Sequence, residues 1–141
     1  LLLPTFGNSI GLAFLGAMII VFVGFTAAFY SARQRGKKEK SFDWLLLIIF
    51  AIPSTIFGIS LIKFYNQPML DLIYSSYWII IIAYVGKFSF ISSKLIGNAI
   101  RQIPKSLEEA AIIQGISPLK RLITIWIPLV MPSLFISFMI S

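Results

Sequence analysis

The sequence has 141 residues, of which 58% are hydrophobic and 12% are charged, and its mean hydropathy is +0.92. Soluble domains carry about 45–50% apolar residues, so this composition excludes a water-exposed globular domain. The net charge of +7 is confined to segments between apolar runs, and we therefore expect no nucleic-acid partner. Cysteine and histidine are both absent, which excludes thiol catalysis, disulfides and the usual metal ligands within these residues. We expect no catalytic residue and no metal site.

Four apolar runs are near or above the roughly 18 residues that can span a bilayer. They predict an all-α, polytopic transmembrane helix bundle that occupies residues 1–141 as a single domain, with spans at about residues 8–30, 42–62, 72–92 and 122–141. Gly11, Gly16 and Gly24 would let the first span approach its neighbours closely. Pro53 and Gly58 predict a kink in the second span. Because the chain starts without Met and stops inside an apolar run, we expect it to be part of a longer protein.

Basic residues cluster in two of the three segments between the predicted spans. They are Arg33, Arg35, Lys37, Lys38 and Lys40 in the first segment, and Lys94, Arg101, Lys105, Lys120 and Arg121 in the polar segment 94–121. The remaining segment carries only Lys63. The positive-inside rule places the two basic segments in the cytoplasm, which predicts a multi-pass protein of the cell inner membrane. Lys87, late in the third span, either reaches toward the headgroups or lines a pathway.

The polar segment contains the signals of a short helix. Ser106 and Glu109 match a Ser-x-x-Glu capping box at its start, and Gly115 favours the left-handed conformation at its end. Ser117 and Pro118 then predict the start of a second helix. Such a helix of about nine residues is marginal in isolation, so we expect it to dock on its own spans, on the membrane surface or on another protein. Its docking face follows the i, i+3, i+4, i+7 spacing of Leu107, Ala110, Ala111 and Gln114.

The order Glu109-Ala110-Ala111, three residues, Gly115, nine residues and Ile125-Trp126-Ile127-Pro128 resembles the Glu-Ala-Ala loop (EAA motif) of permeases from binding-protein-dependent ABC importers. In that family the pattern commonly ends Ile-x-Leu-Pro, and Ile127 is a volume-conserving replacement for the leucine. The segment Ala51–Ile59 is similar to the Pro-x-x-x-x-Gly segment of the iron(III), thiamine and polyamine branch.

The resemblance implies a coupling helix that binds a cytoplasmic ABC ATPase. The residues it assigns to this contact are Ser106, Leu107, Glu108, Glu109, Ala110, Ala111, Gln114, Gly115, Ile116, Ser117 and Pro118. The chain has no Gly-x-x-x-x-Gly-Lys-Ser/Thr loop, so it is not expected to be an enzyme, and ATP and Mg would belong to the ATPase. The other implied partners are an extracytoplasmic solute-binding protein, a second permease half or homodimer mate, and membrane lipid. Iron(III) is the favoured substrate, with thiamine, polyamine and phosphonate as alternatives.

Polar residues in the predicted spans are candidates for lining a substrate pathway. They are Ser54, Thr55, Ser60, Ser75, Ser76 and Tyr84. Hydroxyls in membrane helices more commonly bond to backbone, and Asp43 is read as a favourable charge at a helix start. Two other classes remain open: a secondary transporter or channel fragment without an ATPase, and a structural or assembly protein of the membrane.

Overall fold

A computed structural model describes the backbone of residues 2–33 and 37–141 and the side chains of residues 5–31 and 43–141. The side chains of Arg33, Lys37, Lys38 and Lys40, and all of Arg35, lie outside the described residues. The described chain is helical, and its elements are α1 (Leu2–Arg33), α2 (Lys37–Ala51), α3 (Ser54–Tyr65), α4 (Asp71–Tyr74), α5 (Trp78–Arg101), α6 (Lys105–Ile113), α7 (Pro118–Arg121), the π-helical turn η1 (Leu122–Trp126) and α8 (Ile127–Ile140).

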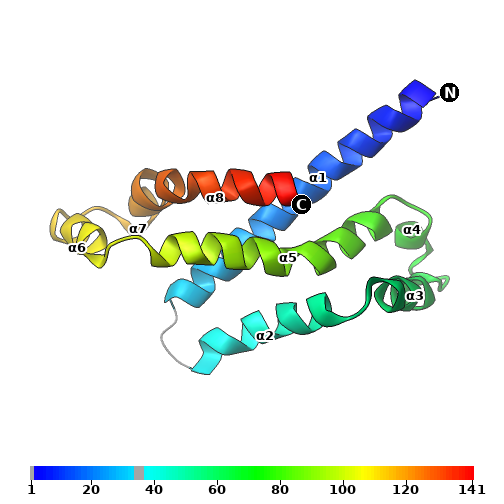
Figure 1. Ribbon diagram of the computed structural model, residues 1–141, viewed down its shortest axis with the longest axis horizontal. Coiled ribbons are helices and arrows are strands. Elements are labelled where there is room, and N and C mark those ends of the chain that lie inside the picture. The colour runs from blue at the N-terminus through cyan, green and yellow to red at the C-terminus, as the bar shows by residue number, and fades with distance from the viewer. Residues whose placement is uncertain (1, 34–36) are drawn as a thin grey trace.

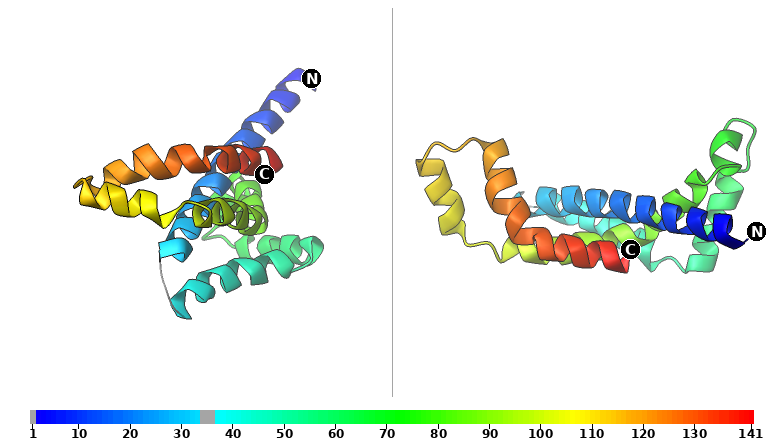
Figure 2. Two further views of the ribbon diagram at one scale, coloured as in Figure 1. Left: turned by 60° about the vertical axis from the view of Figure 1, so that its left-hand side comes forward. Right: turned by 90° about the horizontal axis from the view of Figure 1, so that it is seen from above.

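Helix α5 is the centre of the bundle and packs against α1, α2, α3, α4 and α8 (Figure 1). The short helices α6 and α7 lie at one end of the bundle, and α3 and α4 lie at the other (Figure 2). The C-terminal end of α1 and the N-terminal end of α2 are at the α6 end. The two basic segments of the sequence therefore flank the same end of the bundle, while Lys63 in the last turn of α3 lies at the opposite end.

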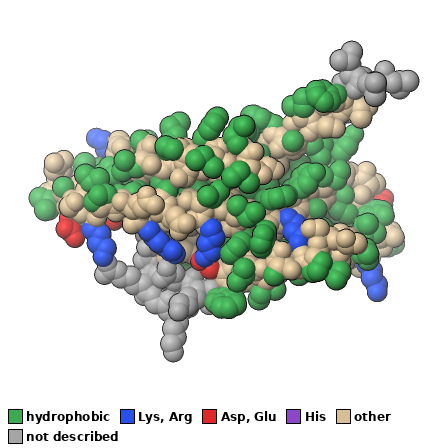
Figure 3. Space-filling model, in the orientation of Figure 1, with side chains coloured by type: hydrophobic (Ala, Val, Ile, Leu, Met, Phe, Trp, Pro, Cys, Tyr) green, Lys and Arg blue, Asp and Glu red, His purple; other side chains and the backbone are tan. Residues whose placement is uncertain are grey.

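Three helical segments are long and apolar enough to cross a membrane: Thr5–Ser31, Trp78–Arg101 and Pro118–Ile140. Large hydrophobic side chains, including Phe6, Phe22 and Phe135, are exposed on their surfaces, as expected for helices that face lipid (Figure 3). The expected transmembrane helix bundle is confirmed.

The predicted kink in the second span is a complete break. Asp43–Ala51 and Ser54–Tyr65 are separate helices at 100° to each other, and they count as a fourth span only if the bent pair is one span. Pro53 has an extended backbone with ψ of 135°, and it cannot donate the hydrogen bond that a continuous helix would need. Its effect also extends to Ile52, because the residue before a proline avoids helical geometry.

The third long helix begins and ends later than the predicted range 72–92. A turn at Ser75 and Ser76 separates α4 from α5, with the two hydroxyls donating to Asp71 O at 2.6 Å and Ile73 O at 2.9 Å. Helix α5 then continues to Arg101. Lys94 and Arg101 are therefore on the helix itself, and Arg101 in its last turn is a favourable cation at the negative end of the helix dipole. The polar connection that follows is correspondingly shorter than the predicted segment 94–121.

The buried core lies where α1, α5 and the η1–α8 segment meet. It consists of Ala28, Ile96, Ile100, Trp126 and Val130. This cluster lies near the α6 end, because Ile100 is one residue from the end of α5 and Trp126 closes η1. The helix ends that carry the α6 loop are therefore held by the best-packed part of the bundle.

Candidate functional site

Helix α6 starts two residues earlier than the capping-box prediction requires. Its N-cap residue is Pro104, with φ −60° and ψ 133°, and no side chain caps the helix start. Ser106 is therefore inside the first turn, and the Ser106–Glu109 capping box is wrong. The carbonyl of Pro104 accepts from Leu107 N at 3.1 Å instead. Glu108 is in the first turn, where its negative charge interacts favourably with the positive end of the helix dipole.

The C-terminal end of α6 forms as the sequence predicts. Gly115 has a φ of 69° and donates to Ile112 O at 2.9 Å, and Ile116 N donates to Ala111 O at 3.0 Å. These two bonds are the Schellman motif, which closes a helix through a residue of positive φ. Two residues on, the Ser117 hydroxyl accepts from Lys120 N at 3.4 Å, and Pro118 is the first residue of α7. Both predicted signals are confirmed.

The surface that α6 presents differs from the predicted docking face. Ala111 is only 4% exposed, so it faces the chain itself, whereas Leu107, Ala110 and Gln114 are exposed. Ile113 is 86% exposed. Ser106, Ala110 and Ile113 are exposed at the spacing i, i+4 and i+7, and we call these three residues the outer face of α6. Glu109 is also exposed, but it lines the cavity on the other side of the helix.

The opposite side of α6 closes a cavity of about 640 Å³. Its walls include Arg101 from the end of α5, Lys105 and Glu108 from α6, Arg121 from α7 and Trp126 from η1. Arg121 Nη1 lies 3.9 Å from Glu108 Oε1, an ion pair that links α6 to α7. The buried Arg121 Nε has no hydrogen-bond partner among the described atoms. The segment formed by α6 and α7 is thus charged, borders a cavity, and connects the end of α5 to the start of the η1–α8 segment.

A family model described as "Binding-protein-dependent transport system inner membrane component" matches residues 20–141, which include α5, α6 and the whole loop. The chain belongs to this family. Its members are transport permease subunits of the inner membrane, so the match agrees with the apolar helices of the fold.

Curated relatives of this inner membrane component are ferric transport permeases. The chain is 30% identical over 131 residues to the putative ferric transport system permease protein FbpB 1 of Haemophilus influenzae, covering 93% of this chain and 21% of that protein. It is 30% identical over 132 residues to the ferric transport system permease protein FbpB of Actinobacillus pleuropneumoniae, covering 93% and 19%. The chain spans about a fifth of the length of these two relatives.

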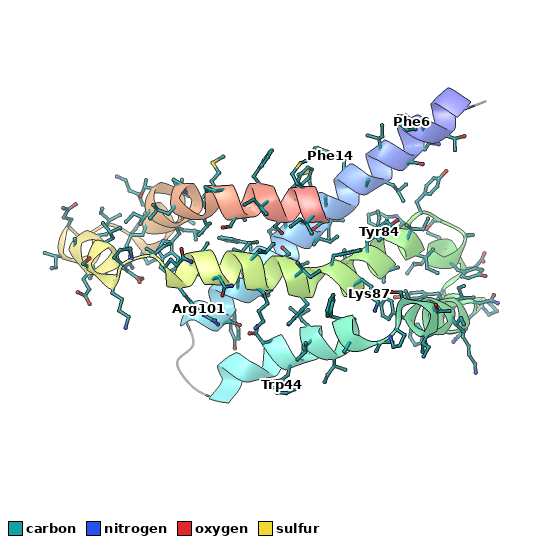
Figure 4. The ribbon with its side chains drawn as sticks, in the orientation of Figure 1. Phe6, Phe14, Trp44, Tyr84, Lys87 and Arg101 are labelled. Atoms are coloured by element: carbon teal, nitrogen blue, oxygen red, sulfur yellow. The ribbon has the colours of Figure 1, made fainter. Side chains whose placement is uncertain are left out.

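The candidate pathway residues of the permease do not form one site. Ser75 and Ser76 bond to their own backbone in the turn before α5, and Thr55 and Ser60 are exposed on α3. Only Ser54 and Tyr84 come together, in the wall of a cavity of about 580 Å³ at the α2–α3 break. Lys87 also lines this cavity. Figure 4 labels Tyr84 and Lys87 on α5.

Two charged contacts of the permease were missed by the sequence reasoning. Lys87 does not reach toward headgroups but donates to the carbonyls of Phe50 and Ile52 at the α2–α3 break. Asp43 is not a charge at a helix start, because α2 begins at Lys37. Its carboxylate pairs with Lys94 Nζ at 2.5 Å and accepts from Ser31 Oγ at 3.3 Å. Pro53 could have indicated the Lys87 contact, because a helix that breaks at a proline leaves carbonyls that need a donor. No local pattern links Asp43 to Lys94.

Proposed function

We propose that this chain is part of the permease of an ATP-driven ABC importer, and that the outer face of α6 binds its cytoplasmic ATPase. The observation that carries the proposal is Ile113, which is 86% exposed on a nine-residue helix at the end of the bundle. Burying an isoleucine side chain is worth about 1.5–3 kcal/mol. A groove on a partner that covered Ile113 would recover that free energy and stabilise a helix too short to be stable alone.

The connections of α6 allow it to transmit a displacement. Only Gln102, Ile103 and Pro104 separate it from α5, and the Glu108–Arg121 ion pair joins it to α7, which continues into η1 and α8. Movement of α6 by an ATPase would therefore move the ends of two long helices. The coupling is reciprocal, so a bundle conformation favoured by ATPase closure favours that closure by the same free energy. Rigid-body movement of this kind is how alternating access is commonly produced.

The proposal divides the chemistry among several proteins. ATP and Mg bind to the ATPase, while this chain contributes helices to the translocation pathway. The names of the ferric transport relatives support iron(III) as the cargo, delivered by an extracytoplasmic binding protein. A second permease half or a homodimer mate completes the pathway around a twofold or pseudo-twofold axis.

The decisive experiment compares two adjacent isoleucines in the full-length transporter. Ile113 belongs to the outer face, whereas Ile112 lines the cavity on the other side of α6. We expect Ile113→Asn to reduce ATPase retention in co-purification by about tenfold, the loss expected of a central interface residue. Ile112→Asn removes the same side chain from the same helix and should retain the ATPase. Equal retention in both variants contradicts docking through the outer face, and absence of ATPase from the unmodified protein favours an ion-driven transporter.

A further inference from the structure

The break between α2 and α3 leaves backbone groups that need partners. Helix α2 ends at Ala51, and α3 begins at Ser54 after a 100° turn. The last carbonyls of a helix have no donor within that helix. In a membrane such groups are costly unless protein or water satisfies them. Carbonyls of Phe50 and Ile52 fall within this exposed end.

Lys87 on α5 supplies the missing donors. Its Nζ donates to Phe50 O at 3.2 Å and to Ile52 O. The ammonium thereby lies at the negative end of the α2 dipole, where a cation is favoured. A lysine that would be unfavourable in the apolar part of a span is held here by two carbonyls that accept from no backbone N–H of the described residues.

Helix α3 covers the same ammonium from the other side of the break. Lys87 Nζ lies 5.4 Å from the centroid of the Phe57 ring, within the range of a cation–π contact. The Phe57 ring also rests on Gly86, where a Cβ atom would lie 2.8 Å from Phe57 Cζ. Two adjacent residues of α5 therefore contact both halves of the broken span.

Lys87 lies in the interior of α5, the helix that leads to α6. At 1.5 Å per residue, Lys87 lies about 14 Å from the start of α5 and about 21 Å from its end at Arg101. Helix α6 follows three residues after Arg101. We propose that Lys87 is a positioning residue that ties the α2–α3 break to α5, so that α3 keeps its place only while this cation is present. The link to transport rests on the proposed function, whereas the positioning of α3 does not.

The test measures the distance between α3 and α5 in the full-length transporter in lipid. Spin labels are attached to cysteines that replace Ile59 on α3 and Asn98 on α5, both exposed, and this chain has no native cysteine. Lys87→Met should raise the fraction of molecules outside the native distance population by about tenfold, which corresponds to about 1.4 kcal/mol. Lys87→Arg, which keeps a cation with several N–H donors, should restore the native distance. Lys63→Met is the matched control, since it removes a lysine from α3 away from the break.

Two results would overturn the positioning role: unchanged distances in Lys87→Met, or an equal change in Lys63→Met. Should Lys87→Met fail to accumulate in the membrane, Lys87→Gln takes its place, because its amide keeps N–H donors but carries no charge. A native distance population in Lys87→Gln would overturn the requirement for a cation.

A second measurement separates this inference from the proposed function. In proteoliposomes containing the ATPase and binding protein, Lys87→Met should lower transport per ATP hydrolysed by about tenfold, the ratio expected for about 1.4 kcal/mol of coupling. Lys87→Arg should recover most of it. Unchanged transport per ATP in Lys87→Met refutes the link to transport. If the unmodified transporter binds no ATPase, the proposed function fails, and the spin-label distances still decide the role of Lys87.

Discussion

Gly24 on α1 approaches Ser92 on α5 so closely that a Cβ atom on Gly24 would lie 2.0 Å from Ser92 Oγ and 2.6 Å from Ser92 Cβ. The Ser92 hydroxyl also accepts a hydrogen bond from Ser137 Oγ of α8 at 2.7 Å. Three long helices therefore meet at one point. Close approach through small residues, with hydroxyls bonded between helices, is the usual way in which membrane helices associate.

Gly24→Ala should destabilise the bundle by about 1–3 kcal/mol, because the added methyl group overlaps Ser92 and α1 must move away from α5. Thermal unfolding in detergent would measure this loss. Gly11→Ala is the matched control on the same helix, since a Cβ atom there has nothing within 4 Å. Equal unfolding temperatures for Gly24→Ala and the unmodified protein would show that α1 and α5 are not in contact at this point.

Gly115→Ala should loosen the end of α6 without any steric clash, because nothing lies within 4 Å of a Cβ atom at this position. The cost is conformational, about 1–2 kcal/mol for a residue with a side chain in the left-handed region. Gly115→Asn should cost less, since asparagine adopts positive φ more readily. Hydrogen exchange at the amides of residues 115 and 116 would report the change, with faster exchange in the alanine variant. Identical exchange in Gly115→Ala and in the unmodified protein would argue against the Schellman closure.

Asp43→Asn should weaken the contact between α2 and α5, because Lys94 loses its carboxylate partner. The Asp43 and Lys94 side chains are 19% and 40% exposed, so the expected coupling is that of a partly solvated pair, about 0.5–1 kcal/mol. The double variant Asp43→Asn/Lys94→Met should therefore be less destabilised than the sum of the single variants. Unfolding midpoints of all four proteins provide this cycle. Strict additivity would mean that the pair contributes nothing to stability.

Local chemistry explains which parts of the site the sequence could predict. The positive φ of Gly115 and the cap formed by Ser117 depend on residues within a few positions, and both were predicted. The start of α6 was not, because Pro104 and Ser106 are competing signals two residues apart and the proline prevails. Similarly, hydropathy placed the end of the third span near Ser92, although Lys94 and Arg101 continue the same helix and the Lys94 ammonium is neutralised by Asp43.

Contacts between distant residues explain the remainder. Lys87 is 35 residues from Ile52, and Lys94 is 51 residues from Asp43. Neither separation leaves a periodicity in the sequence, so only the packing of α2 against α5 reveals these pairs. Pro53 correctly predicted a bend in the second span. The extent of the bend was not predictable, because it depends on contacts with α5 such as those of Lys87.

The two sides of α5 are joined to their neighbours by different forces. Toward α1, the missing side chain of Gly24 lets the backbones interlock, and neither helix can slide without raising a steric barrier. Toward the α2–α3 pair, the attachment depends largely on charge, through the Lys87 ammonium on two carbonyls and the Lys94–Asp43 ion pair. Under mechanical load the bundle is therefore expected to part first along the α2–α3 seam, with α1 and α5 travelling together as one rigid unit.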